Sequence, residues 1–286
     1  MAARVCVVGS VNMDHVFTVA SLPHPGETVM ASSVRLLPGG KGGNQAIAAA
    51  RAGAGVQLVA ALGDDPTGDQ LRAHLSTNGI GLDGLSRVTG PSGSAIIAVD
   101  SAGENTIVVA PGANARLTVQ SSQARAVISA GDVLLLQLEI PVTTAVDAAR
   151  LARDSGSVVI VNASPSGAAP HDLLNLAQLA DVVVVNEAEA REWHWPVRHL
   201  VITRGKRGAS YLGQDERFDV PAPAVKAVDT TGAGDVFAGV LATEWPAGHE
   251  QAVRRACAAG ALATTVPGAG DCAPFAEAID GAVASR

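Results

Sequence analysis

Short runs of apolar, mostly β-branched residues recur along most of the chain, and each is short enough to be a single strand. Six such runs are expected to be strands: 4–10, 56–62, 132–138, 157–163, 181–186 and 199–205. They are apolar at nearly every position instead of alternating with polar residues. That pattern is typical of strands buried on both faces, as in a parallel sheet that helices cover.

Stretches with helical spacing of alanine and leucine lie between these runs, at 43–53, 66–79 and 141–156. The C-terminal part is helical by the same criterion, at 234–246, 249–264 and 274–284. Strands that alternate with helices indicate right-handed crossover connections. We therefore expect a three-layer α/β/α fold with a mainly parallel central sheet.

Two segments break this alternation, residues 14–38 and 93–110, where apolar and polar positions follow a period of two and turn residues intervene. The second predicts a hairpin around residues 101–105. Both segments leave the main sheet and rejoin it, so they predict a small β-sheet that protrudes from the core and covers a site. The whole chain, 1–286, is expected to form one domain.

The composition narrows the class of protein. Hydrophobic residues make up 48% of the chain and charged residues 16%, which is typical of a compact globule. The net charge of −7 argues against nucleic acid or an anionic membrane surface as a partner, because both attract basic surfaces. No uninterrupted apolar run reaches the roughly 18 residues of a spanning helix.

The cysteines and the N-terminal sequence bear on location. Three cysteines without CxxC spacing favour a reducing compartment and give neither a disulfide framework nor a zinc site. The N-terminal residues lack the pattern of a signal peptide, so we expect a cytoplasmic protein. The seven histidines show no metal-ligand spacing.

A glycine-rich stretch, "LPGGKGGNQAIAAARAG", stands before the helix expected at 43–53. Its glycines allow a close approach to a ligand, and Lys41 and Asn44 can bond hydroxyls. It is not a Walker A loop, because Gly42 follows Lys41, and Gln45 stands where the dinucleotide motif needs its last glycine. An ordinary connecting loop is an equal alternative.

Asn12 and Asp14 follow the first strand, where ligands of open α/β sheets bind. An extended segment places both side chains on one face. Turn chemistry alone also explains these residue types.

The stretch "VDTTGAGDVFAGVLA" follows a β-like segment at 224–230 and opens a helix with Gly232, Ala233 and Gly234. Backbone N–H groups at a helix N-terminus attract an anion, so Asp235 is expected beside a phosphate. The alternative is that Asp235 only stabilises the helix start.

Two further strand ends carry candidate chemistry. Asn186 and Glu189 in "VVVVNEAEA" can hold Mg²⁺ through waters, although Glu187 and Glu189 can equally be first-turn partners of the helix dipole. "VITRGKRGA" predicts a phosphate-contacting turn over 203–208.

Together, "GSVNMDH", "PGETV", "GGKGGNQA", "GDDPTG", "APGAN", "LLLQLEIP", "NEAE", "ITRGKRG" and "VDTTGAGDVFAG" resemble the ribokinase family of PfkB-type carbohydrate kinases, in family order over nearly the whole chain. The resemblance implies ATP-dependent phosphorylation of ribose at its 5-hydroxyl. It also implies that the protruding sheet is a lid over the sugar and a homodimer interface.

The resemblance assigns roles residue by residue. Asp235 becomes the general base, and the backbone of Gly232, Ala233 and Gly234 becomes the anion hole. The implied sugar contacts are Asn12, Asp14, Gly40, Lys41, Asn44 and Glu139. The implied ATP contacts are Asn186, Thr203, Arg204, Gly205, Lys206, Arg207, Gly208 and Gly234. Glu189 would organise Mg²⁺ and its waters.

The same resemblance separates the two Gly-Ala-Gly-Asp copies, at 232–235 and 268–271. Relatives activated by K⁺ bind it beside the anion hole, and the implied positions are Asp229, Thr231, Ala263, Val266, Gly268 and Cys272. Cys272 stands where a serine often serves. Asp271 opens no helix directly and is therefore a poor candidate for a base.

Two other readings stay open at this point. The chain can be a kinase of the same family that acts on a nucleoside or another sugar. It can also be a non-catalytic sensor of a sugar or nucleotide, although Asp235 disfavours this because a sensor needs no base.

Overall fold

The computed structural model describes residues 2–284 and is built on an eight-stranded sheet with the order β14-β13-β12-β11-β10-β9-β1-β4. Its strands are β1 (Arg4–Val8), β4 (Gly55–Val59), β9 (Val133–Leu136), β10 (Val158–Asn162), β11 (Val182–Asn186), β12 (His199–Thr203), β13 (Ala209–Leu212) and β14 (Arg217–Val220). All neighbours from β4 to β12 pair in parallel, whereas β13 and β14 pair antiparallel. The six expected strands are confirmed, with the run at 56–62 divided between β4 and β5 (Ala61–Gly63), which pairs with β6 (Ser86–Val88).

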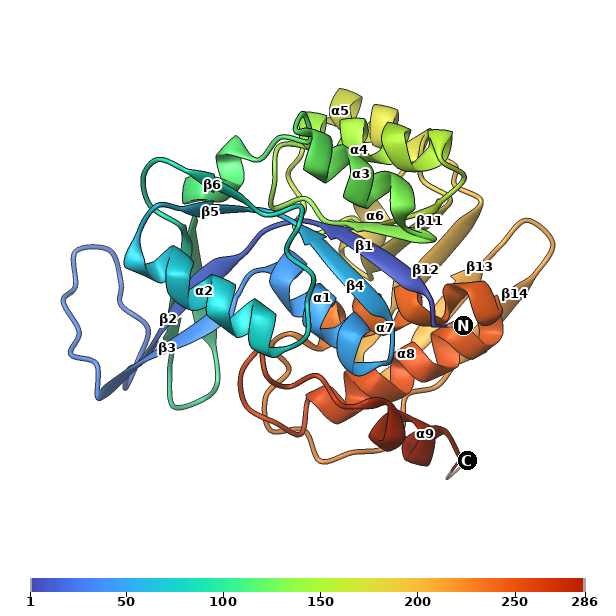
Figure 1. Cartoon of the computed structure of the whole chain (residues 1–286). Helices are drawn as coiled ribbons and strands as arrows, with labels where there is room; N and C mark the ends of the chain where they lie inside the picture. Colours follow the sequence, from blue (N-terminus) through green and yellow to red (C-terminus); the bar gives the residue numbers. More distant parts are fainter. Residues whose placement is uncertain (1, 285–286) are drawn as a thin grey trace.

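Helices cover both faces of this sheet (Figure 1). One face carries α1 (Lys41–Arg51), α2 (Pro66–Thr77), α7 (Ala233–Glu244), α8 (His249–Ala263) and α9 (Ala276–Ala284). The other carries α3 (Ser122–Ala130), α4 (Val142–Asp154) and α5 (Pro170–Ala177), while the short α6 (Glu189–Glu192) follows β11. Short 3₁₀ segments are η1 (Gly112–Arg116), η2 (Gly205–Arg207) and η3 (Trp245–Ala247). The expected three-layer fold is confirmed.

Alternate residues of each central strand point into two separate cores. In β1, Val5 and Val7 join the cluster under α1 and α7, while Cys6 and Val8 join the cluster under α3 and α4. This alternation is why strands buried on both faces are apolar at every position.

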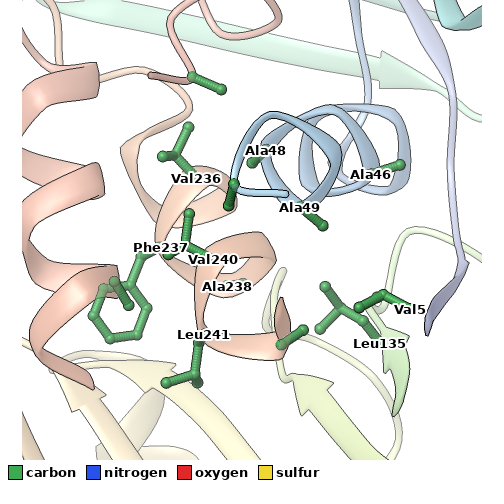
Figure 2. Packing of buried hydrophobic residues seen from close by; sticks show 14 of the residues in the cluster. Val5, Ala46, Ala48, Ala49, Leu135, Val236, Phe237, Ala238, Val240 and Leu241 are labelled. Carbon is green, nitrogen blue, oxygen red and sulfur yellow. The ribbon is translucent and has the colours of Figure 1, made fainter. Parts of the chain in front are cut away.

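Helices α1 and α7 lie side by side, above Val5 and Leu135 of the sheet (Figure 2). Small residues make this close packing possible. A Cβ added to Gly239 of α7 would lie 2.4 Å from the carbonyl oxygen of Gln45 and 2.8 Å from the Cβ of Ala48 in α1. The two helices therefore pack closely against each other along their middle turns.

A second sheet with the order β3-β2-β7-β8 projects from the body and is called the lid sheet below (Figure 1). Its strands are β2 (Asn12–Thr18), β3 (Ser33–Gly39), β7 (Gly93–Val99) and β8 (Asn105–Ala110). Val16, Ala95 and Ile97 on its inner face form a small core of their own. The strands come from the two segments whose period-two pattern predicted them.

One expected element is absent. The segment at 224–230 was expected to be β-like, but it is irregular in the structure. Pro221 and Pro223 directly precede it and supply no backbone donor, and the N–H groups of Val228 and Asp229 donate to the carbonyl of Thr264 instead of to a strand. This pairing ties the segment to the C-terminal loop. Among residues 2–284, no helix has the length and hydropathy needed to cross a membrane.

Candidate active site

Several of the predicted site residues meet at the carboxyl ends of the parallel strands of the central sheet. Asn162, Asn186 and Thr203 are the last residues of β10, β11 and β12, and all three line a cavity of about 170 Å³. The full lining is Lys41, Asn162, Ser164, Val184, Val185, Asn186, Glu189, Thr203, Gly232, Gly234 and Asp235. A larger surface hollow of about 630 Å³ beside His249 contains none of the predicted residues. The smaller cavity is therefore the candidate site.

Asp235 lies in the first turn of α7 and is only 7% exposed. Its Oδ2 accepts a hydrogen bond from Asn44 Nδ2 at 3.0 Å, and its Oδ1 accepts one from Gln45 Nε2 at 3.0 Å. Both donors come from the first turns of α1. The carboxylate is therefore held at both oxygens while it still lines the cavity.

The backbone before Asp235 opens α7 as predicted. Gly232 has a φ of 78°, which favours glycine, and a Cβ there would lie 2.7 Å from the carbonyl oxygen of Ala269. The N–H of Ala233 donates to Thr230 O at 3.3 Å. Gly232 and Gly234 line the cavity, so their side of the helix N-terminus is the part that faces a ligand.

The glycine-rich stretch lets α1 begin against the end of β1. Gly40 has a φ of 86°, and a Cβ on Gly42 would lie 2.6–2.7 Å from backbone atoms of Gly9 and Ser10. Helix α1 starts at Lys41, two residues earlier than expected from the alanine pattern. Lys41 and Asn44 are thereby carried to the cavity and to Asp235.

The residues assigned to the sugar surround this helix start. Glu139 Oε2 accepts hydrogen bonds from Ser10 Oγ at 2.5 Å and from the N–H of Lys41 at 3.1 Å. Asn12 is buried in β2, and its Oδ1 accepts a hydrogen bond from Asn114 Nδ2 at 2.7 Å. Asp14 lies two residues further along β2, so its side chain is on the same face of the lid sheet as that of Asn12.

Negative charge predominates in this space. Burial, reinforced by the charges of Glu139 and Asp235, raises the pKa of Asp14 to about 7. Burial alone would lower the pKa of Lys41, but the charges of Asp235, Glu139 and Glu189 outweigh it, so the pKa of Lys41 is raised. Lys41 is thus a firmly charged cation among carboxylates, and the site suits a neutral polyhydroxyl ligand better than a second acid.

Asn186 and Glu189 bond each other across the start of α6. Asn186 Oδ1 accepts from the N–H groups of Ala188 and Glu189, both at 2.9 Å, and Glu189 Oε2 accepts from the N–H of Asn186 at 2.8 Å. This reciprocal pattern is that of a capping box. Of the two carboxylate oxygens of Glu189, only Oε2 accepts a hydrogen bond from the described residues, so Oε1 is available to a ligand or water.

Two of the three basic side chains in the turn over 203–208 form ion pairs with acidic residues. Arg204 pairs with Asp219 and Arg207 pairs with Glu187. Lys206 is exposed and has no ion pair within the described residues. Thr203 alone of this turn lines the cavity.

The residues assigned to K⁺ join two distant segments next to α7. Asp229 accepts from the N–H of Thr231 and from the N–H of Gly268, both at 2.9 Å. Burial would raise the pKa of Asp229, but these two hydrogen bonds outweigh it and lower the pKa. Ala263 is buried and Val266 is exposed. The N–H of Val266 donates a hydrogen bond to the carbonyl of Ala263 at 3.2 Å.

Of the residues assigned to K⁺, Cys272 has the side chain that suits the ion least. Its thiol is buried and donates to the carbonyl of Ala269 at 3.2 Å. Burial raises the pKa of Cys272 to about 11, so the side chain stays a neutral thiol. The chemistry of the set fits K⁺ through oxygen atoms, and within the described residues no group of three or more acidic, histidine or cysteine side chains offers a different metal centre.

The second Gly-Ala-Gly-Asp copy lies outside the cavity. Arg51 Nη1 donates to the carbonyls of Asp271 and Ala273, both at 2.9 Å, and Arg51 Nη2 lies 3.4 Å from Asp271 Oδ1. Helix α9 begins at Ala276, so Asp271 opens no helix. Asp271 therefore has none of the surroundings of Asp235.

Sequence reasoning missed several polar residues of the site, namely Ser10, Gln45, Gln137 and Asn162. Their common signal is position: Gln137 directly follows β9 and Asn162 ends β10, at the edge where ligands of parallel sheets bind. Gln45 has no such signal. Its link to Asp235 exists only because α1 packs on α7.

Known proteins match the chain over nearly its full length. The family model for pfkB family carbohydrate kinases matches residues 2–276. The ribokinase of Haemophilus influenzae is 33% identical over 94% of this chain and 94% of its own length. A bifunctional ribokinase/ribose-5-phosphate isomerase A of Fructilactobacillus sanfranciscensis is 33% identical over 96% of this chain, which spans only 55% of that protein.

A solved structure gives the same picture. Arabidopsis thaliana ribokinase complexed with ribose and ATP superposes with a TM-score of 0.90 at 28% identity, and the match covers 99% of both chains. From the family model, the identities and the common fold, this chain belongs to the pfkB family of carbohydrate kinases.

Proposed function

We propose that this protein is a ribokinase, which transfers the γ-phosphoryl group of ATP to the 5-hydroxyl of D-ribose. The observation that carries the proposal is Asp235, buried at the N-terminus of α7 and facing a cavity, with both carboxylate oxygens held by amides of α1. Relatives named ribokinase at full coverage, and one solved with ribose and ATP, support the choice of substrates.

In the proposed reaction, Asp235 accepts the proton of the sugar hydroxyl as its oxygen forms a bond to the γ-phosphorus. The bond between that phosphorus and the β–γ bridging oxygen breaks, and ADP leaves with that oxygen. The N-terminus of α7 at Gly232–Gly234 stabilises the negative charge on the transferred group, and Lys41, which also lines the cavity, adds a cation.

The sugar contacts are proposed on the lid side of Asp235, at Asn12, Asp14, Gly40, Lys41, Asn44 and Glu139. Asn44 supports this placement, because its Oδ1 is buried and accepts no hydrogen bond from the described residues. A buried acceptor of this kind is costly unless a ligand donates to it. A sugar hydroxyl is the natural donor there.

ATP is proposed to lie along the ends of β11 and β12, with the phosphates toward Gly234. Asn186 and Thr203 contribute from the cavity wall, Gly205 and Lys206 from the exposed part of the turn, and Gly208 from its buried end. Because Arg204 and Arg207 are already paired with acidic residues, Lys206 is the principal cation of this turn for a phosphate.

Two cations complete the proposal. Mg²⁺ would be held through waters by Glu189 and Asn186, and it neutralises charge on the β- and γ-phosphates. K⁺ would bind between the turn at Asp229 and Thr231 and the loop of Ala263, Val266 and Gly268, mainly through oxygens. Cys272 then borders this site as a neutral thiol.

The lid sheet is proposed to close over ribose and to form a homodimer. Cross-strand register places Leu36, His15, Ile96 and Val108 in one row across β3, β2, β7 and β8. Leu36, Ile96 and Val108 of this row are 53–61% exposed. An apolar row of that exposure is typical of a surface that another chain covers.

The three free cysteines support a cytoplasmic location.

The test is a coupled ADP-release assay of the purified protein with ribose, other pentoses, hexoses and nucleosides. Ribose is expected to give the highest kcat/KM. A higher kcat/KM with a nucleoside or another sugar would change the proposed substrate but not the proposal that the protein is a kinase. Absence of turnover with every acceptor would favour the sensor. Replacement of K⁺ by Na⁺ at equal ionic strength is expected to lower kcat, and equal rates would refute the K⁺ site.

A further inference from the structure

We propose that Gln45 and Gln137 are positioning residues that set the orientation of the Asp235 carboxylate through a relay of neutral amides. The inference rests on the proposed function, in which Asp235 is the base. Neither glutamine lines the cavity, so neither is expected to touch a substrate.

Gln45 uses both N–H groups of its side-chain amide and also its carbonyl oxygen. Its Nε2 donates to Asp235 Oδ1 and to Asn162 Oδ1, both at 3.0 Å. Its Oε1 accepts from Gln137 Nε2 at 2.8 Å. Gln45 and all of these partners are less than 9% exposed, so the bonds lie in a largely buried environment.

Gln137 completes the arrangement in which the Gln45 nitrogen faces Asp235. An amide can present either its oxygen or its nitrogen to a neighbour. Asp235 can only accept, so the Gln45 nitrogen turns toward it, and the Gln45 oxygen then accepts from Gln137 Nε2, whose own Oε1 accepts no hydrogen bond within the described residues. A reversed Gln45 would place its oxygen against the oxygens of Asp235 and Asn162, and no hydrogen bond would remain.

The ends of the relay are anchored in the fold. Gln137 lies against the backbone after β1, where a Cβ on Gly9 would fall 1.8 Å from its Oε1. Asn162 Nδ2 donates to the carbonyl of Val184 in β11 at 3.3 Å. The close packing of Gly239 on Gln45 and Ala48 keeps α1 at a constant distance from α7.

Neutral donors suit a base better than a cation would. A lysine or arginine in the place of Gln45, bonded directly to Asp235, would form an ion pair with it and reduce its affinity for the sugar proton. Amides orient the carboxylate and leave its charge available. A base whose orientation is lost by a small displacement loses rate with little change in substrate binding.

The experiment compares Gln45→Met, Gln137→Met, the double variant and Gln251→Met, a control at an exposed position of α8. Measured quantities are kcat, KM for ribose and for ATP, and Tm. Each single site variant is expected to lower kcat about 10- to 100-fold with KM changed less than about twofold. The double variant is expected to be no slower than Gln45→Met, because both act along one route.

Unchanged kcat in either variant overturns the relay, as does a double variant whose losses multiply or a loss carried by KM alone. If a Met variant unfolds, Gln137→Leu removes the donor with another apolar side chain, and the same loss of kcat is expected. Failure of the proposed function shows instead in the unaltered protein, as a better acceptor than ribose. The variants are then compared on that acceptor, with the same pattern expected.

Discussion

At the scale of the residue, Asp235 and Asp271 end identical tetrapeptides in different surroundings. Asp235 is buried and lines the cavity, whereas Asp271 is exposed and borders Arg51. Asp235→Asn is expected to lower kcat about 10²- to 10⁴-fold, the usual contribution of a general base. Asp271→Asn is expected to leave kcat nearly unchanged, and steady-state kinetics of both variants make the comparison. Similar losses in the two would contradict these roles.

The raised pKa of Asp14 predicts that the stability of the folded protein depends on pH. Its pKa is raised from 3.8 to about 7, mainly by burial, so the unfolded chain releases this proton at a lower pH than the folded chain does. The free energy of unfolding therefore falls as pH rises from about 4 to about 7 and then levels off. Asp14→Asn removes this loss, so its Tm is expected to exceed that of the unaltered protein at pH 8 but not at pH 4.

The control for this prediction is Asp215→Asn in the exposed turn between β13 and β14. Its Tm relative to the unaltered protein is expected to be the same at both pH values. Calorimetric melts of the three proteins across this range decide the matter. A constant difference for Asp14→Asn would show that the carboxyl is ionised throughout. The same variant is expected to raise KM for ribose, because the proposed sugar contact loses its charge.

At the scale of the element, the start of α1 depends on one close approach. Gly42→Ala places a methyl group 2.6–2.7 Å from backbone atoms of Gly9 and Ser10, which cannot yield as a side chain can. We expect a loss of about 1–3 kcal/mol in stability, as for overpacked cores, and a higher KM for ribose because Lys41 and Asn44 shift. Chemical denaturation and sugar titrations measure the two effects.

Gly43 supplies the matched control in the same helix turn. A Cβ there meets its nearest neighbours, side-chain atoms of Val11 and Leu75, at 3.8–3.9 Å, which is ordinary contact. Gly43→Ala is therefore expected to keep KM and to gain up to about 1 kcal/mol from helix propensity. Equal destabilisation by the two alanines would refute the importance of the close approach.

The elements differ in how well the sequence predicts them. Parallel strands such as β1 and β9 are buried on both faces, so their apolar runs are visible without other information. The hairpin of β13 and β14 escaped prediction, because both strands are only four residues long and the edge strand β14 mixes Arg217 and Asp219 with apolar residues. Edge strands carry no continuous apolar signal.

The residues of the candidate site also differ in how well the sequence predicts them. Glycines and charged residues near strand ends, such as Lys41 and Asp235, stand out by type and place. Gln45 and Gln137 do not, because a neutral amide within an apolar stretch carries no periodic or charge signal. Their contact joins residues far apart in the chain and depends on how α1, α7 and β9 pack together. Only the three-dimensional arrangement supplies that information.

At the scale of the whole molecule, the two faces of the lid sheet carry different kinds of residues. The inner face carries Asp14 and the small core of Val16, Ala95 and Ile97. The outer face presents Leu36, Ile96 and Val108 in one cross-strand row, each more than half exposed. A lone domain gains nothing from an exposed apolar row, whereas a second copy of the chain would bury it. The proposed dimer therefore places the two lids against each other.

Ile96→Asp tests this arrangement, because a buried, unpaired carboxylate in an apolar interface is strongly unfavourable. The unaltered protein is expected to be a dimer by light scattering after size exclusion, and the variant a monomer with a similar Tm. Leu174→Asp on α5, also an exposed apolar position, is the control and is expected to remain a dimer. A monomeric unaltered protein, or a dimeric Ile96→Asp, would place the interface elsewhere. Since the inner face carries the proposed sugar contact at Asp14, the monomeric variant is also expected to raise KM for ribose more than KM for ATP.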